Sequence, residues 1–136
     1  MSTRKSYLQP RRSRLLVTSI DVAVLARLRA DLGGDDDVMR ELADAFLSQS
    51  PRLIEDARVA AAARAGDRLA RAVHTLKSSA ATLGATQLAH LARDLEADAM
   101  AGTVRDAPAR VRALATEYAS VEHELRAWVA PGGHQK

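Results

Sequence analysis

The chain has 136 residues, of which 47% are hydrophobic and 3% aromatic, with no cysteine and a formal net charge of +3. That length favours one domain with a core of ordinary size, and the lack of cysteine excludes disulfides, thiol nucleophiles, cysteine-ligated zinc and iron–sulfur clusters. No apolar run approaches the roughly 20 residues that a membrane span requires, and no signal-peptide pattern opens the chain, so we expect a cytoplasmic protein.

Positive charge is concentrated at the N-terminus. Residues 1–18 carry five Lys or Arg side chains and no acid, whereas the rest of the chain is mildly acidic. We expect residues 1–18 to form a disordered basic leader, residues 19–130 the folded domain and residues 131–136 a frayed tail. A basic tail with one aromatic residue, Tyr7, is weak evidence for nucleic-acid or membrane contact, and we expect neither.

Apolar residues at three- and four-residue spacing predict helices along the rest of the chain, without strand-like alternation. A first helix, which Ser19 or Asp21 can cap, is expected to end at Gly33-Gly34. A second helix is expected to begin at the three aspartates 35–37, whose charge favours a helix N-terminus. The same carboxylates suggest calcium, but no alternating pattern of ligands follows them, so we predict no metal site.

Four longer helices are predicted in total. The second helix is expected to continue to about residue 65, with Pro51 causing a kink or a restart. Asp67 is expected to cap the third helix, the fourth is expected to span about residues 86–101, and the fifth carries an apolar stripe over residues 111–128. The second helix is predicted to carry the apolar residues Val38, Leu42, Ala45 and Phe46.

Short connections between these helices indicate an all-α protein in which antiparallel neighbours share one core. We predict an antiparallel four-helix bundle built from the second to fifth helices, with the short first helix as an additional N-terminal element at one end.

His74 is the residue with the most informative surroundings. It is predicted to lie opposite the apolar stripe of the third helix and therefore to face water. Lys77 lies to one side, and the neighbours on the same face are small, namely Ser78, Ala81 and Ala85. An exposed imidazole with small neighbours and one cation leaves room for a flat protein surface, as a phosphoryl-accepting histidine requires.

An acidic neighbour for His74 follows from the turn after its helix. If the chain reverses at Gly84-Ala85, residues equally far from the turn lie level, which places residues 94–96 beside His74. Asp94 or Glu96 can then reach the imidazole, and we prefer Glu96. Its carboxylate would hold one ring nitrogen protonated and leave the other nucleophilic. A solvated surface charge is the alternative interpretation.

The segment from His74 to Ala85, His-Thr-Leu-Lys-Ser-Ser-Ala-Ala-Thr-Leu-Gly-Ala, resembles the signature of histidine-containing phosphotransfer (HPt) domains of two-component phosphorelays. That signature is usually H-x-L-K-G-(S/A)-S-x-x-(hydrophobic)-G-A, and the resemblance covers roughly residues 20–128. Ser78 departs from the glycine that is frequent after the lysine, but serine is still small enough for a receiver domain to approach.

The resemblance implies a phosphocarrier rather than an enzyme. His74 would accept a phosphoryl group from the aspartate of a receiver domain and pass it to another receiver, while Lys77 neutralises charge on the phosphoryl oxygens. Receiver domains and a sensor or hybrid histidine kinase are the implied partners of a protein that we expect to be monomeric. Mg²⁺ is expected only on the receiver, so no cofactor is predicted for this chain.

A surface around His74 is predicted to bind these partners. Its candidate residues are Arg71, Ser78, Ala81, Gly84, Ala85 and His90. Two other functions remain open. The chain would serve as a helical adaptor if it bound a receiver or kinase without passing phosphate on, or as a nucleic-acid-associated bundle if the N-terminal cations had that role.

Overall fold

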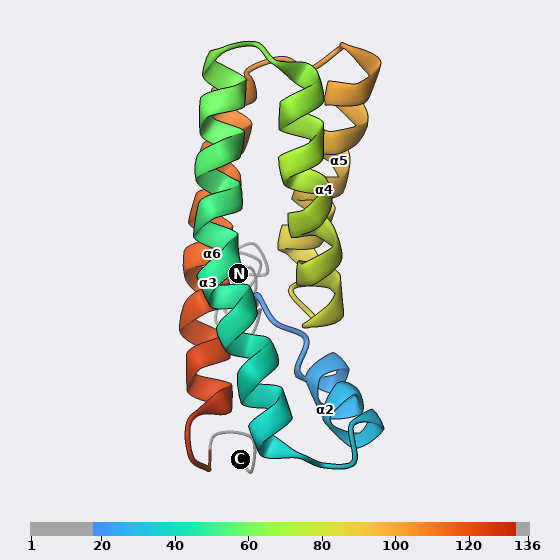
Figure 1. Ribbon diagram of the computed structural model, residues 1–136, viewed down its shortest axis with the longest axis vertical. Coiled ribbons are helices and arrows are strands. Elements are labelled where there is room, and N and C mark those ends of the chain that lie inside the picture. Colours follow the sequence, from blue (N-terminus) through green and yellow to red (C-terminus); the bar gives the residue numbers. More distant parts are fainter. Residues whose placement is uncertain (1–17, 133–136) are drawn as a thin grey trace, which may run out of the picture.

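Five α-helices make up the part of the chain that the structure describes, residues 18–132 (Figure 1). Residues 1–17 and 133–136 lie outside it, so the predictions of a disordered leader and a frayed tail are not tested. In this computed structural model the helices are α2 (Val22–Asp31), α3 (Asp36–Ala62), α4 (Gly66–Thr82), α5 (Thr86–Ala101) and α6 (Ala107–Val129).

The four longer helices form the predicted antiparallel bundle, and α2 lies at one end of it (Figure 1). Each bundle helix packs against two neighbours, in the pairs α3–α4, α4–α5, α5–α6 and α3–α6. Their apolar faces share one core that includes Leu69, Leu95, Leu114 and Leu125. Between residues 18 and 132, no helix is both long enough and apolar enough to span a membrane.

Only some of the apolar residues expected on α3 are buried. Met39, Ala43 and Phe46 are buried, whereas Leu42 is 37% exposed and Ala45 is exposed. The buried residues follow three- and four-residue spacing, and Phe46 packs against Tyr118 on α6, with ring centroids 5.9 Å apart. The periodicity of one helix contains no information about where the neighbouring helix lies.

Pro51 lies inside an uninterrupted helix, so the predicted restart is wrong. Proline has no N–H, and the carbonyl of Leu47, four residues earlier, therefore lacks its usual helical donor. The hydroxyl of Tyr118 on α6 donates to this carbonyl at 3.3 Å. Burial raises the pKa of Tyr118 to about 12, which keeps the donor protonated.

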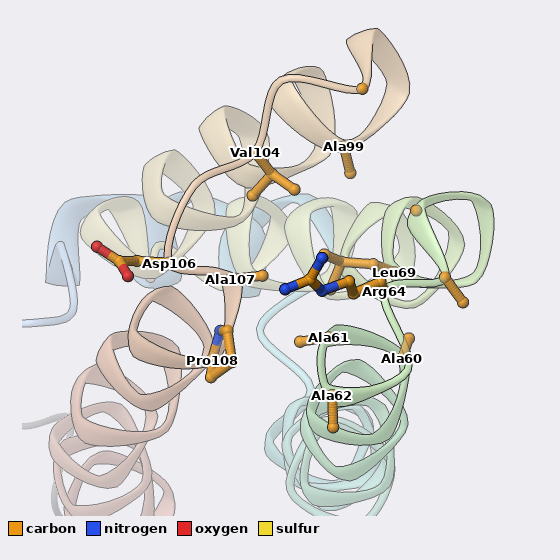
Figure 2. Close-up of a pocket in the computed structure, with 13 residues that line it drawn as sticks. Ala60, Ala61, Ala62, Arg64, Leu69, Ala99, Val104, Asp106, Ala107 and Pro108 are labelled. Atoms are coloured by element: carbon orange, nitrogen blue, oxygen red, sulfur yellow. The ribbon is translucent and has the colours of Figure 1, made fainter.

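A cavity of about 750 Å³ lies at the end of the bundle where α3 connects to α4 and α5 to α6 (Figure 2). Its wall consists mainly of alanine and other apolar side chains, such as Leu69 and Val104. Arg64 and Asp106, which also line it, have positive φ angles of 55° and 50° in the two connections. The lining residues do not include His74, so this cavity is separate from the predicted site.

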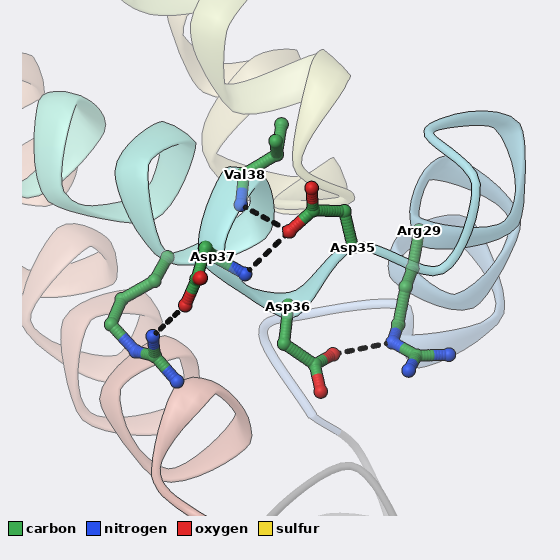
Figure 3. Close-up of polar contacts among 6 residues, drawn as sticks. Arg29, Asp35, Asp36, Asp37 and Val38 are labelled. Atoms are coloured by element: carbon green, nitrogen blue, oxygen red, sulfur yellow. Dashed lines mark hydrogen bonds and ion pairs between the residues drawn. The ribbon is translucent and has the colours of Figure 1, made fainter.

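The three aspartates after α2 each have a structural partner (Figure 3). The Asp35 carboxylate accepts hydrogen bonds from the first amides of α3, and Asp36 pairs with Arg29 at 2.6 Å. Asp37 pairs with Arg40 at 2.9 Å. These contacts account for the run of acids as a cap and two ion pairs. Among residues 18–132, no group of three or more His, Asp or Glu side chains is arranged to hold a metal ion.

The residues before α2, which we call the N-terminal strap (residues 18–21), are fastened at two points. The backbone N–H groups of Ser19 and Ile20 donate to the Glu124 carboxylate on α6, both at 2.8 Å. The N–H of Asp21 donates to the Gly84 carbonyl in the α4–α5 turn, also at 2.8 Å. Asp21, one of the two residues predicted to cap this helix, also caps α2. The strap therefore connects α6 to the turn that follows the helix of His74.

Candidate functional site

His74 lies on the solvent side of α4. The opposite face of this helix packs into the core through Leu69, Val73, Leu76 and Ala80. The His74 side chain is 58% exposed, as the helical periodicity predicts. Asp67, which was expected to cap α4, instead lies in its first turn, and the capping position is Ala65, which makes no side-chain cap. The position of His74 on the helix face does not depend on this cap.

A carboxylate from α5 bridges His74 and Lys77. Glu96 Oε2 lies 2.7 Å from His74 Nδ1, and Glu96 Oε1 lies 2.7 Å from Lys77 Nζ. The Glu96 side chain is 14% exposed, so most of it is enclosed between the two helices. Asp94, the other candidate, is 60% exposed and pairs with its neighbour Arg93. The level register across the α4–α5 turn thus brings Glu96, and not Asp94, to the imidazole.

The ion pair fixes which proton the imidazole carries. The hydrogen bond from Lys77 lowers the pKa of Glu96, burial opposes this effect, and the hydrogen bond with His74 lowers it further. Glu96 is therefore ionised at neutral pH, and an ionised carboxylate accepts hydrogen bonds but donates none. Nδ1 of His74 must then carry a proton, and in the neutral ring this leaves the lone pair on Nε2. Nε2 is the nitrogen that this geometry makes nucleophilic.

Four of the predicted partner-binding residues are small or basic and lie at the surface. Arg71, Ser78, Ala81 and His90 are exposed. The hydroxyl of Ser78 donates to the His74 carbonyl at 3.3 Å, so it lies along the helix. A groove of about 390 Å³ between α3 and α4 is lined by Arg71 together with residues that sequence reasoning did not select, including Val59 and Arg68. In the sequence, the polar face of the α4 helical pattern is the signal that indicates Arg68 as an exposed residue.

Two of the predicted partner-binding residues are not accessible. Ala85 is 0% exposed and Gly84 is buried. Both residues would lie on the exposed face if α4 continued, but the helix ends at Thr82. They belong to the following turn, where the N-terminal strap and α2 lie against Gly84. A Cβ on Gly84 would lie 2.8 Å from the Asp21 carbonyl oxygen and 3.0 Å from Val24 Cβ. Neither residue can therefore contact a partner.

Comparison with known proteins adds a family match. A model of the Hpt domain matches residues 41–124, which include α4 and α5 entirely. Among solved structures, histidine-containing phosphotransfer protein B (HptB) from Pseudomonas aeruginosa PAO1 is similar, with 26% sequence identity and a TM-score of 0.73. The match covers 81% of this chain and 93% of that chain. A search of curated proteins gave no match.

Proposed function

Because this chain belongs to the Hpt domain family and so functions in histidine phosphotransfer within a phosphorelay, we propose that His74 is the residue that carries the phosphoryl group. The observation that supports this assignment is the contact between His74 Nδ1 and the Glu96 carboxylate at 2.7 Å on an exposed helix face. It leaves Nε2 of the neutral ring unprotonated, on a side chain that is 58% exposed. The protein is a phosphocarrier, because the group that it accepts leaves again and the chain is unchanged over the cycle.

The transfer step uses Nε2 of His74 as the nucleophile. Nε2 forms a bond to the phosphorus of an aspartyl phosphate on a receiver domain, and the bond from phosphorus to the aspartate oxygen breaks. The electron pair of that bond stays on the receiver carboxylate. The same events in reverse deliver the phosphoryl group to a second receiver. The imidazole ring gains positive charge while Nε2 is bonded to phosphorus, and the Glu96 carboxylate stabilises that charge through the Nδ1 proton.

Lys77 has two successive roles in this proposal. Its ammonium group pairs with Glu96 at 2.7 Å and is one helical turn from His74. An ammonium has three donors, so it can hold Glu96 with one and offer another to a phosphoryl oxygen. Lys77 therefore keeps Glu96 ionised before transfer and neutralises phosphoryl charge during it. We assign Mg²⁺ and the other catalytic groups to the receiver.

HPt domains interact with receiver domains and kinases. For this chain we propose that the contact surface consists of Arg71, Ser78, Ala81 and His90 around His74, and that the protein acts as a monomer. Small residues next to the histidine let a receiver approach closely, and Arg71 offers a cation to the acidic groups that hold Mg²⁺ on such a partner.

A transfer assay tests the assignment. The protein is incubated with a receiver that carries labelled aspartyl phosphate, and label is expected on this chain in an acid-labile, base-stable linkage. His74→Gln should abolish the label, whereas His123→Gln, which removes an exposed histidine from α6, should retain it. Labelling that persists in His74→Gln would refute the assignment. A stable complex with the receiver but no label would instead support the helical adaptor.

A further inference from the structure

A groove of about 620 Å³ lies between the N-terminal strap, the start of α2 and the last turns of α6. Much of its wall is apolar, and this apolar surface includes Val22, which is 58% exposed. The lining residues that matter here are Thr18, Ile20, Val22, Ala127 and Trp128. None of them lies on α4 or α5, so the groove is formed by elements other than those that carry His74 and Glu96.

The described chain starts at the rim of this groove. Thr18 is itself part of the wall, and its hydroxyl donates to the Ile20 carbonyl at 2.8 Å. The next two amides are held by Glu124, and the Ile20 side chain is 1% exposed. Three hydrogen bonds and the burial of Ile20 therefore fix the strap at the rim of the groove.

The residues immediately before Thr18 are apolar. Residues 15–17 read Leu-Leu-Val, whereas residues 1–14 are mostly polar and contain five Lys or Arg side chains. Three extended residues span at most about 10 Å, which is enough to lie along a groove whose rim they already adjoin. A segment tethered at the rim has a high effective concentration there, which a separate molecule must match by affinity.

We propose that this groove is the docking site of the chain's own residues 15–17, with Leu15, Leu16 and Val17 packing over Val22 and Trp128. Removal of this apolar surface from water drives the contact. Docking holds the strap against α6, and through Asp21 it supports the α4–α5 turn at Gly84. The face of α4 that carries His74 stays open, so the docked segment does not compete with a receiver.

Trp128 provides the readout, because it is the only tryptophan in the chain. We would measure its emission maximum and its quenching by acrylamide in the full-length protein and in the variant Leu15→Ser/Leu16→Ser/Val17→Ser. The matched control is Arg11→Ser/Arg12→Ser/Arg14→Ser, which changes three side chains just before this segment and removes charge instead of apolar surface. Far-UV circular dichroism checks that every variant keeps its helices.

The proposal predicts emission at longer wavelength and stronger quenching in the apolar variant, and wild-type values in the arginine variant. Unchanged quenching in the apolar variant would overturn it. An equal effect in the arginine variant would also overturn it, because a cation over the indole ring would then be the contact. Quenching that rises on dilution of the wild-type protein would identify a second copy of the chain as the occupant and likewise refute docking of residues 15–17.

Discussion

At the residue scale, the site depends on one carboxylate with two partners. Glu96 accepts from Lys77 through one oxygen and contacts Nδ1 of His74 through the other, both at 2.7 Å. An amide at this position has only one oxygen, so it can accept fully from one of the two groups at a time. The carboxylate therefore holds the proton on Nδ1 of His74 and the position of Lys77 together. A glutamine at position 96 can keep only one of these two contacts.

The pH dependence of stability tests whether Glu96 is ionised in the folded protein. Its pKa lies below the ordinary value of 4.5, so the ionised form stabilises the fold above that value, and this contribution is lost as the pH falls through the lowered pKa. Glu96→Gln should therefore lower the free energy of unfolding at pH 7, and the difference from wild type should shrink in acid. Urea denaturation at a series of pH values measures both.

Asp94→Asn serves as the control for this experiment. It removes a carboxylate two residues earlier on α5, where the side chain is 60% exposed and pairs only with Arg93 among the described contacts. Exposed pairs contribute little, so its effect on unfolding should be small. Equal stability of Glu96→Gln and wild type at pH 7 would show that the bridge to Lys77 and His74 does not stabilise the fold.

At the element scale, the sequence predicts the helices better than their contacts. The apolar spacing correctly indicates five helices and an exposed His74, and counting from the turn places Glu96 opposite it, because these properties depend on local geometry. It does not show which apolar residues of α3 are buried, and it leaves Gly84 and Ala85 exposed. Gly84 contacts the N-terminal strap, more than 60 residues away in the chain, and no local pattern contains that contact.

The α4–α5 turn allows a test of the strap. Gly84 and Gly102 have similar φ angles, +78° and +73°, but a Cβ on Gly84 would meet Asp21 and Val24, whereas nothing lies within 4 Å of the same atom on Gly102. Both alanine substitutions incur backbone strain of roughly 1–3 kcal/mol. Gly84→Ala should cost more, because the strap must also move. Chemical denaturation of both variants gives the comparison, and equal losses would mean that the strap does not press on the turn.

At the scale of the whole molecule, a polar contact between helices that are far apart in sequence compensates for the proline in α3. Tyr118 on α6 donates to the Leu47 carbonyl, which Pro51 leaves without a helical donor. Tyr118 also packs against Phe46, so one side chain both fills the core and satisfies a backbone acceptor. The bundle thus keeps α3 continuous over 27 residues despite its proline.

Tyr118→Phe is expected to destabilise the protein by about 1–3 kcal/mol, the usual cost of leaving a buried acceptor without its partner. The variant should also change the response to alkali. Because the pKa of Tyr118 is raised to about 12 from an ordinary value of 10.0, its contribution to stability is complete below pH 10 and is lost as the pH rises towards 12. Denaturation at neutral and alkaline pH measures both effects, and an identical alkaline loss in Tyr118→Phe would contradict this assignment.

The position of the phosphoryl group on the His74 ring is the most direct test of the mechanism. After transfer from a phosphorylated receiver, NMR of the ¹⁵N-labelled imidazole and of ³¹P distinguishes phosphorylation at Nε2 from phosphorylation at Nδ1. The geometry predicts phosphate on Nε2 and a proton on Nδ1, where Glu96 Oε2 lies 2.7 Å away. Phosphate on Nδ1, or on a side chain other than His74, would contradict it.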